Sequence, residues 1–146
     1  NMVKLDYSQI LNYDETKFWN NLTNFKELPK NLPRQLQKIE ILEENDNETI
    51  LEIIIFVRSI IKKEFAIKLK VLKKSEKEIF LEVLDGFAKG TKSTVSTSLQ
   101  DNKIICQINT EIKFNLKTMI LIPIVKKEYE GILIKFFRNM EKGIVE

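Results

Sequence analysis

Hydrophobic and polar residues alternate along most of the chain, and this two-residue period is typical of strands with one covered face. A weak alternation over residues 2–10 predicts a first strand. From Leu36 onward, similar runs follow one another, with polar or glycine-containing turns every ten to twelve residues. These runs predict six further strands, at residues 36–43, 49–58, 63–72, 77–84, 89–99 and 103–114. Strands joined by such short turns indicate an antiparallel meander.

A short helix is predicted after the first strand. Asp14 can cap its first turn, and apolar side chains recur at helical spacing from Phe18 to Phe25, so the helix covers about residues 14–24. The prolines at positions 29 and 33 restrict the next segment to a short helical turn that carries Leu28 and Leu32.

The end of the chain has the pattern of a long amphipathic helix. Residues 124–142 place charged side chains largely on one side and an apolar stripe on the other. The stripe consists of Tyr129, Ile132, Leu133, Phe136, Phe137 and Met140. Gly131 weakens this helix and is expected at a point of close packing, and Gly143 is expected as its C-cap.

Length and composition indicate one domain with a substantial core. The chain has 146 residues, of which 43% are hydrophobic, and we assign residues 2–146 to a single domain. Histidine is absent and Cys106 is the single cysteine, which excludes Ser-His-Asp and Cys-His catalysis, a histidine zinc site and an intrachain disulfide. Four glycines leave little scope for a phosphate-binding loop. The sequence therefore assigns no catalytic residue, no metal site and no cofactor.

The charge pattern favours an ordinary mixed surface. The net charge is +3, the lysines are interleaved with acidic residues, and only three arginines occur. Nucleic-acid binders concentrate positive charge and favour arginine, so we expect no nucleic-acid partner. The most apolar windows, residues 50–57 and 119–125, are far shorter than the ~20 residues that span a bilayer. Without a secretory signal pattern either, we expect no stable membrane insertion and a cytoplasmic location.

The element order resembles the helix-grip fold of the START, birch-pollen-allergen and polyketide-cyclase superfamily. Residues 14–33 carry a local match: an acidic helix start, Trp19, a leucine three residues later, an aromatic residue and a proline-containing turn. Within the superfamily, the cyclase/dehydrase-like and coenzyme-Q-binding branches are the most similar. The resemblance implies an α+β fold in which a curved antiparallel sheet of about seven strands wraps around the C-terminal helix, with two short helices between strands 1 and 2. It also implies a cavity between sheet and helix that holds an apolar ligand.

The alternation along each strand selects the residues that would line this cavity. Small hydroxyl side chains among bulky apolar ones would leave room and orient a ligand, although they could equally be bonded locally within the sheet. Tyr129 needs a hydrogen-bond partner if it is buried, and a ligand oxygen could serve. The predicted lining is Leu28, Leu32, Leu69, Val71, Leu81, Val83, Thr91, Ser93, Val95, Ile108, Thr110, Ile112, Tyr129, Leu133 and Phe136.

Three functions remain open on the sequence. The first is a non-enzymatic module that binds or transports a lipid, an isoprenoid quinone or a polyketide-like molecule. The second is an aromatase/cyclase- or dehydrase-like enzyme that uses the same cavity. The third is a structural or chaperone-binding role through the outer face of the sheet. There, Ile54, Phe56 and Phe80 have outward parity and suggest an apolar patch through which a homodimer could form.

Overall fold

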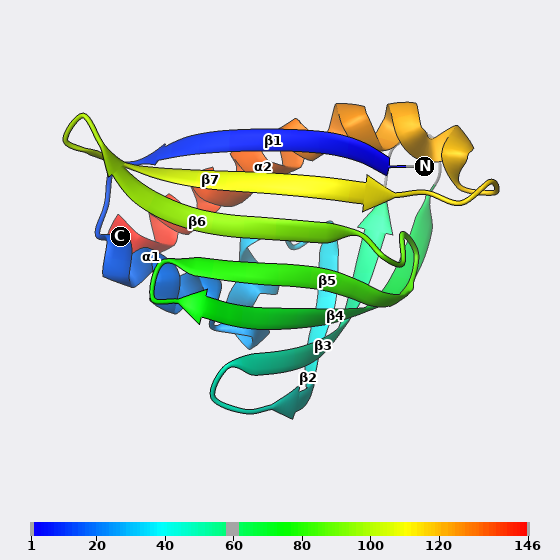
Figure 1. Ribbon diagram of the computed structural model, residues 1–146, viewed down its shortest axis with the longest axis horizontal. Coiled ribbons are helices and arrows are strands. Elements are labelled where there is room, and N and C mark those ends of the chain that lie inside the picture. The colour runs from blue at the N-terminus through cyan, green and yellow to red at the C-terminus, as the bar shows by residue number, and fades with distance from the viewer. Residues whose placement is uncertain (1, 58–61, 146) are drawn as a thin grey trace.

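A curved seven-stranded antiparallel sheet is the main feature of the computed structural model, which describes residues 2–57 and 62–145 (Figure 1). The strand order is β1-β7-β6-β5-β4-β3-β2, so every hairpin pairs neighbours in sequence and the first strand closes against the last. The strands are β1 (Met2–Leu11), β2 (Leu36–Glu44), β3 (Glu48–Val57), β4 (Lys63–Ser75), β5 (Glu78–Gly86), β6 (Lys92–Gln100) and β7 (Lys103–Lys113). The helices are α1 (Glu15–Leu22), the 3-10 helices η1 (Phe25–Asn31) and η2 (Met119–Leu121), and α2 (Ile122–Val145).

The predicted meander is confirmed, and two of its boundaries were wrong by three residues. The strand expected to end at Leu72 continues to Ser75, because Lys73 still pairs with Ile79 across the hairpin. The strand expected from Lys89 begins only at Lys92, because the chain first turns through two glycines with φ of +92°. The predicted end of the strand 49–58 at Arg58 lies outside the described residues.

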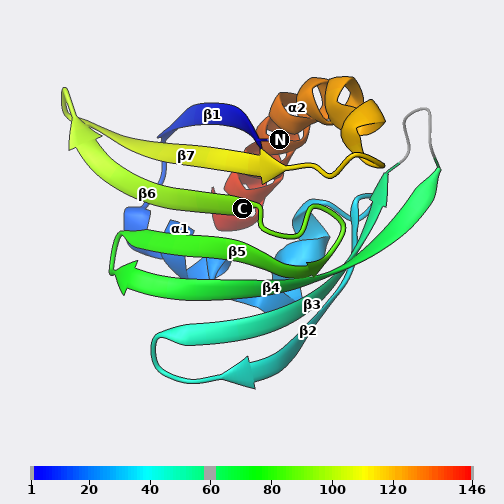
Figure 2. The same ribbon diagram turned by 45° about the vertical axis from the view of Figure 1, so that its right-hand side comes forward.

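The two α-helices, α1 and α2, lie on the same side of the sheet, within its curvature (Figures 1 and 2). The Asp14 side chain caps α1 by accepting hydrogen bonds from the backbone N–H groups of Thr16 and Lys17, as the sequence predicts. The Trp19 indole on α1 then donates to Thr97 Oγ1 on β6 at 2.9 Å. This buried hydrogen bond fastens the short helix to the sheet.

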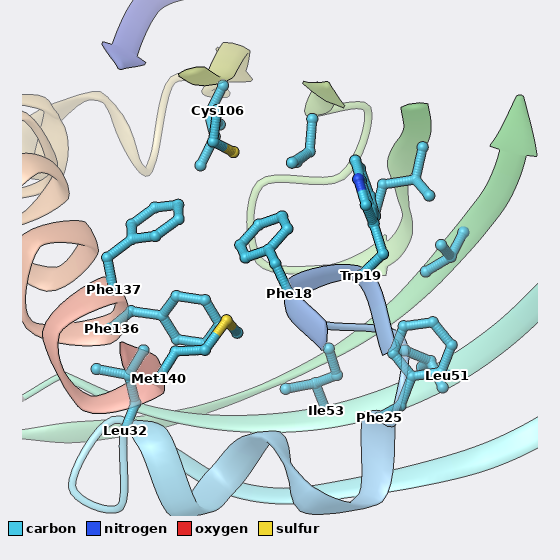
Figure 3. Close-up of a cluster of buried hydrophobic side chains, with 14 of the residues drawn as sticks. Phe18, Trp19, Phe25, Leu32, Leu51, Ile53, Cys106, Phe136, Phe137 and Met140 are labelled. Carbon is cyan, nitrogen blue, oxygen red and sulfur yellow. The ribbon is translucent and has the colours of Figure 1, made fainter. Parts of the chain in front are cut away.

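The C-terminal half of α2 closes one end of the space inside the sheet (Figure 3). Phe137 stacks on Phe18 of α1 with ring centroids 5.9 Å apart, and on Tyr7 of β1 at 5.8 Å. Met140 and Phe136 are buried in the same cluster. The Asn139 side chain donates to the backbone carbonyl of Asn31 at 2.9 Å, which ties this half of the helix to η1.

Two expectations about the glycines of α2 were wrong. Gly143 does not end the helix, which continues to Val145. Gly131 is exposed, and an added Cβ would meet nothing within 4 Å, so close packing does not explain it. Neither position requires the conformational freedom of glycine.

The outer face of the sheet carries apolar residues in two separate groups. Ile54 pairs with Ala66 at one end of β4, and Phe80 pairs with Leu72 near the other. The outward residues of β4 between these positions are lysines, and one of them, Lys70, lies 3.5 Å from the Glu82 carboxylate. The apolar surface predicted from Ile54, Phe56 and Phe80 is therefore interrupted by charge.

Within the described residues, no helix combines the length and the apolar character needed to cross a membrane.

Candidate functional site

The inner face of the sheet changes from fully buried to half-buried along its length. Directly opposed residues of an antiparallel pair share one face, so the register identifies this side. At the end covered by α1 and the C-terminal half of α2, Leu51 and Cys106 are essentially inaccessible, with 1% and 0% of their surface exposed. At the other end, Ile55 and Phe65 lie opposite each other and both remain half-buried. The layers therefore separate toward the second end.

The helix α2 shows the same change along its length. Its buried residues are Phe136, Phe137 and Met140, all in the C-terminal half. Between Ile122 and Lys135 no side chain is fully buried, although the apolar stripe continues. The N-terminal half thus presents apolar side chains to a space that the protein does not fill.

That space is a groove of about 390 Å³ between the N-terminal half of α2 and the end of β3. Most of its lining is apolar, and three polar side chains join it: Gln35, Glu128 and Tyr129. The apolar lining residues are Ile55, Phe56, Val57, Ile124, Val125, Ile132 and Leu133. A small side pocket of about 30 Å³, lined in part by Val57, Ile124 and Val125, adjoins it and reaches the contacting, mutually tilted rings of Phe65 and Phe87.

A chain of three hydroxyl groups links the groove to the sheet. Tyr129 O–H lies 2.9 Å from Thr110 Oγ1, which in turn lies 2.9 Å from Ser93 Oγ. Burial raises the pKa of the Tyr129 hydroxyl, Asp6 adds to the rise, and the hydrogen bond to Thr110 opposes it. The tyrosine therefore stays protonated at neutral pH. The partner that its burial requires is Thr110, so a ligand oxygen is not needed to satisfy it.

The structure brings only part of the predicted lining together. Tyr129 and Leu133 line the groove, and Ser93 and Thr110 support Tyr129. Leu69 and Leu81 lie on the inner face and remain half-buried against the core. The remaining inner-face residues are packed and buried: Val71, Val83, Val95, Ile108 and Ile112.

Four other predicted residues lie away from the groove. Leu28, Leu32 and Phe136 pack in or against the core cluster at the closed end. Thr91 precedes β6, and its hydroxyl accepts a hydrogen bond from the backbone N–H of Lys113 at 3.0 Å. The Thr91 hydroxyl is therefore bonded within the sheet and does not face a ligand site, which is the second of the two roles considered for these hydroxyl side chains. Its hydroxyl extends the hydrogen bonding between β6 and β7 beyond the last pair of that ladder.

Sequence reasoning missed most of the groove lining. The alternation that directs Ile54 outward directs Ile55 and Val57 inward, so these two were available from the pattern. Phe56 has the outward parity of Ile54 and was predicted on the outer face, but at the end of β3 it also borders the groove. Ile132 was on the predicted apolar stripe of the helix. Gln35 carried no signal, because it lies between the proline turn and β2, where no periodicity applies.

A second cavity lies at the opposite end of the sheet. Its volume is about 460 Å³, and asparagines and charged residues of the two hairpin turns make up much of its lining. Val71 is the one predicted lining residue that borders it, beside Trp19 and Phe25. Ser93 and Thr110 also border a hollow on the outer face, among Lys4, Asp6 and other charged residues. Neither space has the apolar wall expected of the predicted site.

No protein-family model matches the sequence, and no curated protein matches it.

Solved structures do match it over nearly its whole length. A START superfamily protein from Mycobacterium smegmatis gives a TM-score of 0.76, covering 97% of this chain and 96% of that chain at 15% identity. The di-domain ARO/CYC StfQ from the steffimycin biosynthetic pathway gives 0.80, covering 98% of this chain and 50% of that chain at 6% identity. The protein has the helix-grip fold. At such identities the likeness shows this fold and no particular activity.

A plant protein shares the helix-grip fold as well. Major latex-like protein 151 from Panax ginseng gives a TM-score of 0.73 at 17% identity, covering 98% of this chain and 97% of that chain. These neighbours share the fold that the element order implies. In this helix-grip protein, the fully buried side chains of α2 all lie in its C-terminal half.

Proposed function

We propose that this helix-grip protein binds a predominantly apolar small molecule in the groove between α2 and β3. One observation carries the proposal: the apolar stripe of α2 continues into its N-terminal half, where its side chains are only half-buried and line an open groove. Exposed contiguous apolar surface is costly in water, and a ligand that covers it gains the free energy of that burial. A lipid, an isoprenoid quinone or a polyketide-like molecule would supply such a surface.

The size and polarity of the groove suit such a ligand. Its volume of about 390 Å³ lies near the lower end of the roughly 300–1,000 Å³ of small-molecule sites. A ring system or one segment of a longer molecule would fill it. Tyr129, held in place by Thr110, supplies a fixed polar group beside the apolar wall, and such groups orient ligands in apolar sites.

Native mass spectrometry, followed by extraction of any copurified molecule, tests the proposal directly. Titration with the neutral probe N-phenyl-1-naphthylamine tests the position of the site. Leu133→Trp should fill the groove and abolish probe binding, whereas Ile134→Trp, at the next and exposed position of α2, should leave it unchanged. Equal binding by the two variants, or no binding by the parent protein and no extracted ligand, would exclude this site.

An enzymatic role in the same groove is the second candidate, and one observation favours it. Glu128 and Tyr129 both line the groove, so a carboxylate and a protonated phenol face the same bound molecule. Such a pair could move protons on a poly-carbonyl chain held in a reactive geometry, as an aromatase/cyclase or dehydrase requires. Glu128→Gln would then slow the conversion of a linear poly-carbonyl thioester, followed by absorbance, while retaining probe binding. No turnover by the parent protein would count against this candidate.

The other expectations from the sequence stay predictions. They are the homodimer through the outer face, the cytoplasmic location and the absence of a nucleic-acid partner. A closed, filled interior would favour the third role, a structural or chaperone-binding one through the outer face, and the open groove does not.

A further inference from the structure

One of the two most apolar stretches of the chain is not buried. Residues 119–125 are entirely apolar, yet the helix η2 and the first turn of α2, which they form, hold no fully buried residue. Ile120 is 79% exposed, and Leu116, four residues earlier, is 88% exposed. These are the highest exposed fractions of any large hydrophobic side chain within residues 2–57 and 62–145. Since such surface is costly in water, the pair indicates a contact site.

A tight turn fixes the backbone around Leu116. The Asn115 N–H donates to Thr118 Oγ1 at 3.0 Å, and the Thr118 N–H donates to Asn115 Oδ1 at 2.9 Å. The Met119 N–H donates to the Asn115 carbonyl at 3.0 Å. Leu116 and Lys117 form the tip of this turn, and both side chains lie in water. A surface that is ordered in advance loses little entropy when it binds.

Positive charge accompanies the exposed apolar side chains. Residues 112–127, here called the basic apolar segment, contain four exposed lysines and no acidic residue. The net charge of the whole chain is only +3, so the remaining residues together are close to neutral. The nearest acidic residues in the sequence are Glu111 on β7 and Glu128 in the groove. The lysines are Lys113, Lys117, Lys126 and Lys127.

The basic apolar segment lies at the end of the molecule where the groove is found. Figures 1 and 2 show the connection from β7 into α2, coloured yellow to orange, protruding beyond one end of the sheet. Ile124 and Val125, at the end of the apolar run, line the groove. Leu116 and Ile120 border neither the groove nor its side pocket. The apolar run therefore continues from the groove wall to an exposed tip.

We propose that the basic apolar segment docks the protein reversibly on an anionic membrane surface, with Leu116 and Ile120 inserted among the lipid headgroups and the lysines contacting the phosphates. At this interface the apolar side chains leave water while the positive charges stay at the headgroups. The protein then lies on the bilayer without spanning it. A second copy of the chain fits this surface less well, because two facing segments would bring their lysines together. The docking goes beyond the proposed ligand binding and does not require it.

Cosedimentation with lipid vesicles tests the docking. The parent protein should bind vesicles of equimolar phosphatidylcholine and phosphatidylglycerol roughly tenfold more tightly than vesicles of phosphatidylcholine alone. Added salt should reduce this difference because it screens the lysines. Leu116→Trp should show a blue shift of its tryptophan emission on the anionic vesicles. Leu99→Trp, at an exposed leucine in the β6–β7 hairpin and hence at the other end of β7, should not.

A pair of double variants tests the apolar contribution. Leu116→Ser combined with Ile120→Ser should weaken binding to the anionic vesicles at least tenfold, because the two side chains that enter the interface are removed. Ile10→Ser combined with Leu99→Ser removes two exposed apolar side chains at the other end of the sheet and should leave binding unchanged. Circular dichroism establishes that both variants fold.

A second pair tests the contribution of the lysines. Lys117→Gln combined with Lys126→Gln should remove most of the preference for phosphatidylglycerol. Lys26→Gln combined with Lys103→Gln changes the net charge equally at exposed positions outside the basic apolar segment, and should retain the preference. Equal losses in the two variants would show that net charge alone attracts the vesicles and would overturn the docking site.

The possible results separate the docking from the function of the groove. No binding of the parent protein to anionic vesicles, or undiminished binding by the Leu116→Ser/Ile120→Ser variant, would overturn the docking. A dimer in light scattering that this variant abolishes would also overturn it, since the segment would then join two copies. Without vesicles, the variant should still bind N-phenyl-1-naphthylamine, because neither residue lines the groove. A parent protein that binds vesicles but not this probe would contradict the groove function and leave the docking intact.

Discussion

The Tyr129 hydroxyl on α2 and the Thr110 hydroxyl on β7 lie 2.9 Å apart and form a side-chain hydrogen bond between the open half of the long helix and the sheet. Ser93 extends the contact to β6. The C-terminal half of α2 is held by buried aromatic packing, whereas here a polar contact contributes to the spacing of the two layers. The hydroxyl chain can thus hold the helix near the sheet without filling the groove.

We expect Tyr129 and Thr110 to be energetically coupled. Tyr129→Phe and Thr110→Val each remove one hydroxyl and leave the other without this partner, so each should lower the free energy of unfolding by about 1–2 kcal/mol. The double variant should lose less than the sum of the two. Urea denaturation of the four proteins measures the coupling. Additive losses would show that the contact contributes nothing, and the exposed pair Gln100 and Ser98 provides a control cycle.

The Trp19–Thr97 hydrogen bond should matter more than an average surface contact. Because both residues are buried, Trp19→Phe leaves the Thr97 hydroxyl unpaired and should cost about 1–3 kcal/mol of unfolding free energy. Asn20→Ala, at the next and exposed position, should change it little. Thermal denaturation of both variants checks this. A Trp19→Phe variant as stable as the parent would contradict the anchoring role of the indole.

Cys106 should make the fold sensitive to alkaline pH. Burial raises the pKa of this thiol from 9.0 to about 12, so above pH 9 the unfolded chain ionises and the folded one does not. The unfolded state then binds fewer protons, and stability should fall by about 1.4 kcal/mol per pH unit as the pH rises above 9, a contribution fully present below that pH.

Cys106→Ala removes this contribution. The variant should be less stable than the parent at pH 8, because the thiol is fully buried and a cavity remains, but its stability should decline less steeply between pH 9 and 10. Urea denaturation across this range gives both slopes. Parallel slopes would mean that the thiol ionises equally in both states.

Two glycines should respond to alanine in opposite ways. Gly86 has φ of +92°, and an added Cβ would lie 2.1 Å from the backbone oxygen of Ala66, so Gly86→Ala should cost more than about 2 kcal/mol. Gly131 lies in an exposed part of α2 with open space around it. Gly131→Ala should therefore stabilise the protein by about 0.5–1 kcal/mol, since alanine favours the helix. Melting temperatures that move in the same direction would contradict this.

The homodimer proposed through the outer face predicts a concentration-dependent mass. Light scattering should show a dimer at high protein concentration, and Ile54→Glu should restore the monomer because it places charge in the apolar group next to Ala66. Glu52→Lys, at an outward position already charged in the parent, is the control. A parent protein that remains monomeric at the highest concentration would rule out the dimer.

The sequence by itself determined the elements and the faces of this protein. The two-residue alternation fixes which side chains of a strand share a side, and Asp14 and the prolines mark local helix boundaries, so the meander and both helices followed from neighbours along the chain. The buried half of the helical stripe, with Phe136, Phe137 and Met140, was predictable for the same reason.

Only the tertiary structure decided where the inner face stays open. Leu32 and Leu133 look alike in the sequence, yet Leu32 is buried in the core and Leu133 lines the groove. Gln35, from a turn, and Glu128, from the distant helix, come together because the end of β3 faces the start of α2. Periodicity records the side on which a residue lies, whereas a cavity depends on the distance between layers. That distance is set by side chains far apart along the chain, such as the stacked Phe18 and Phe137.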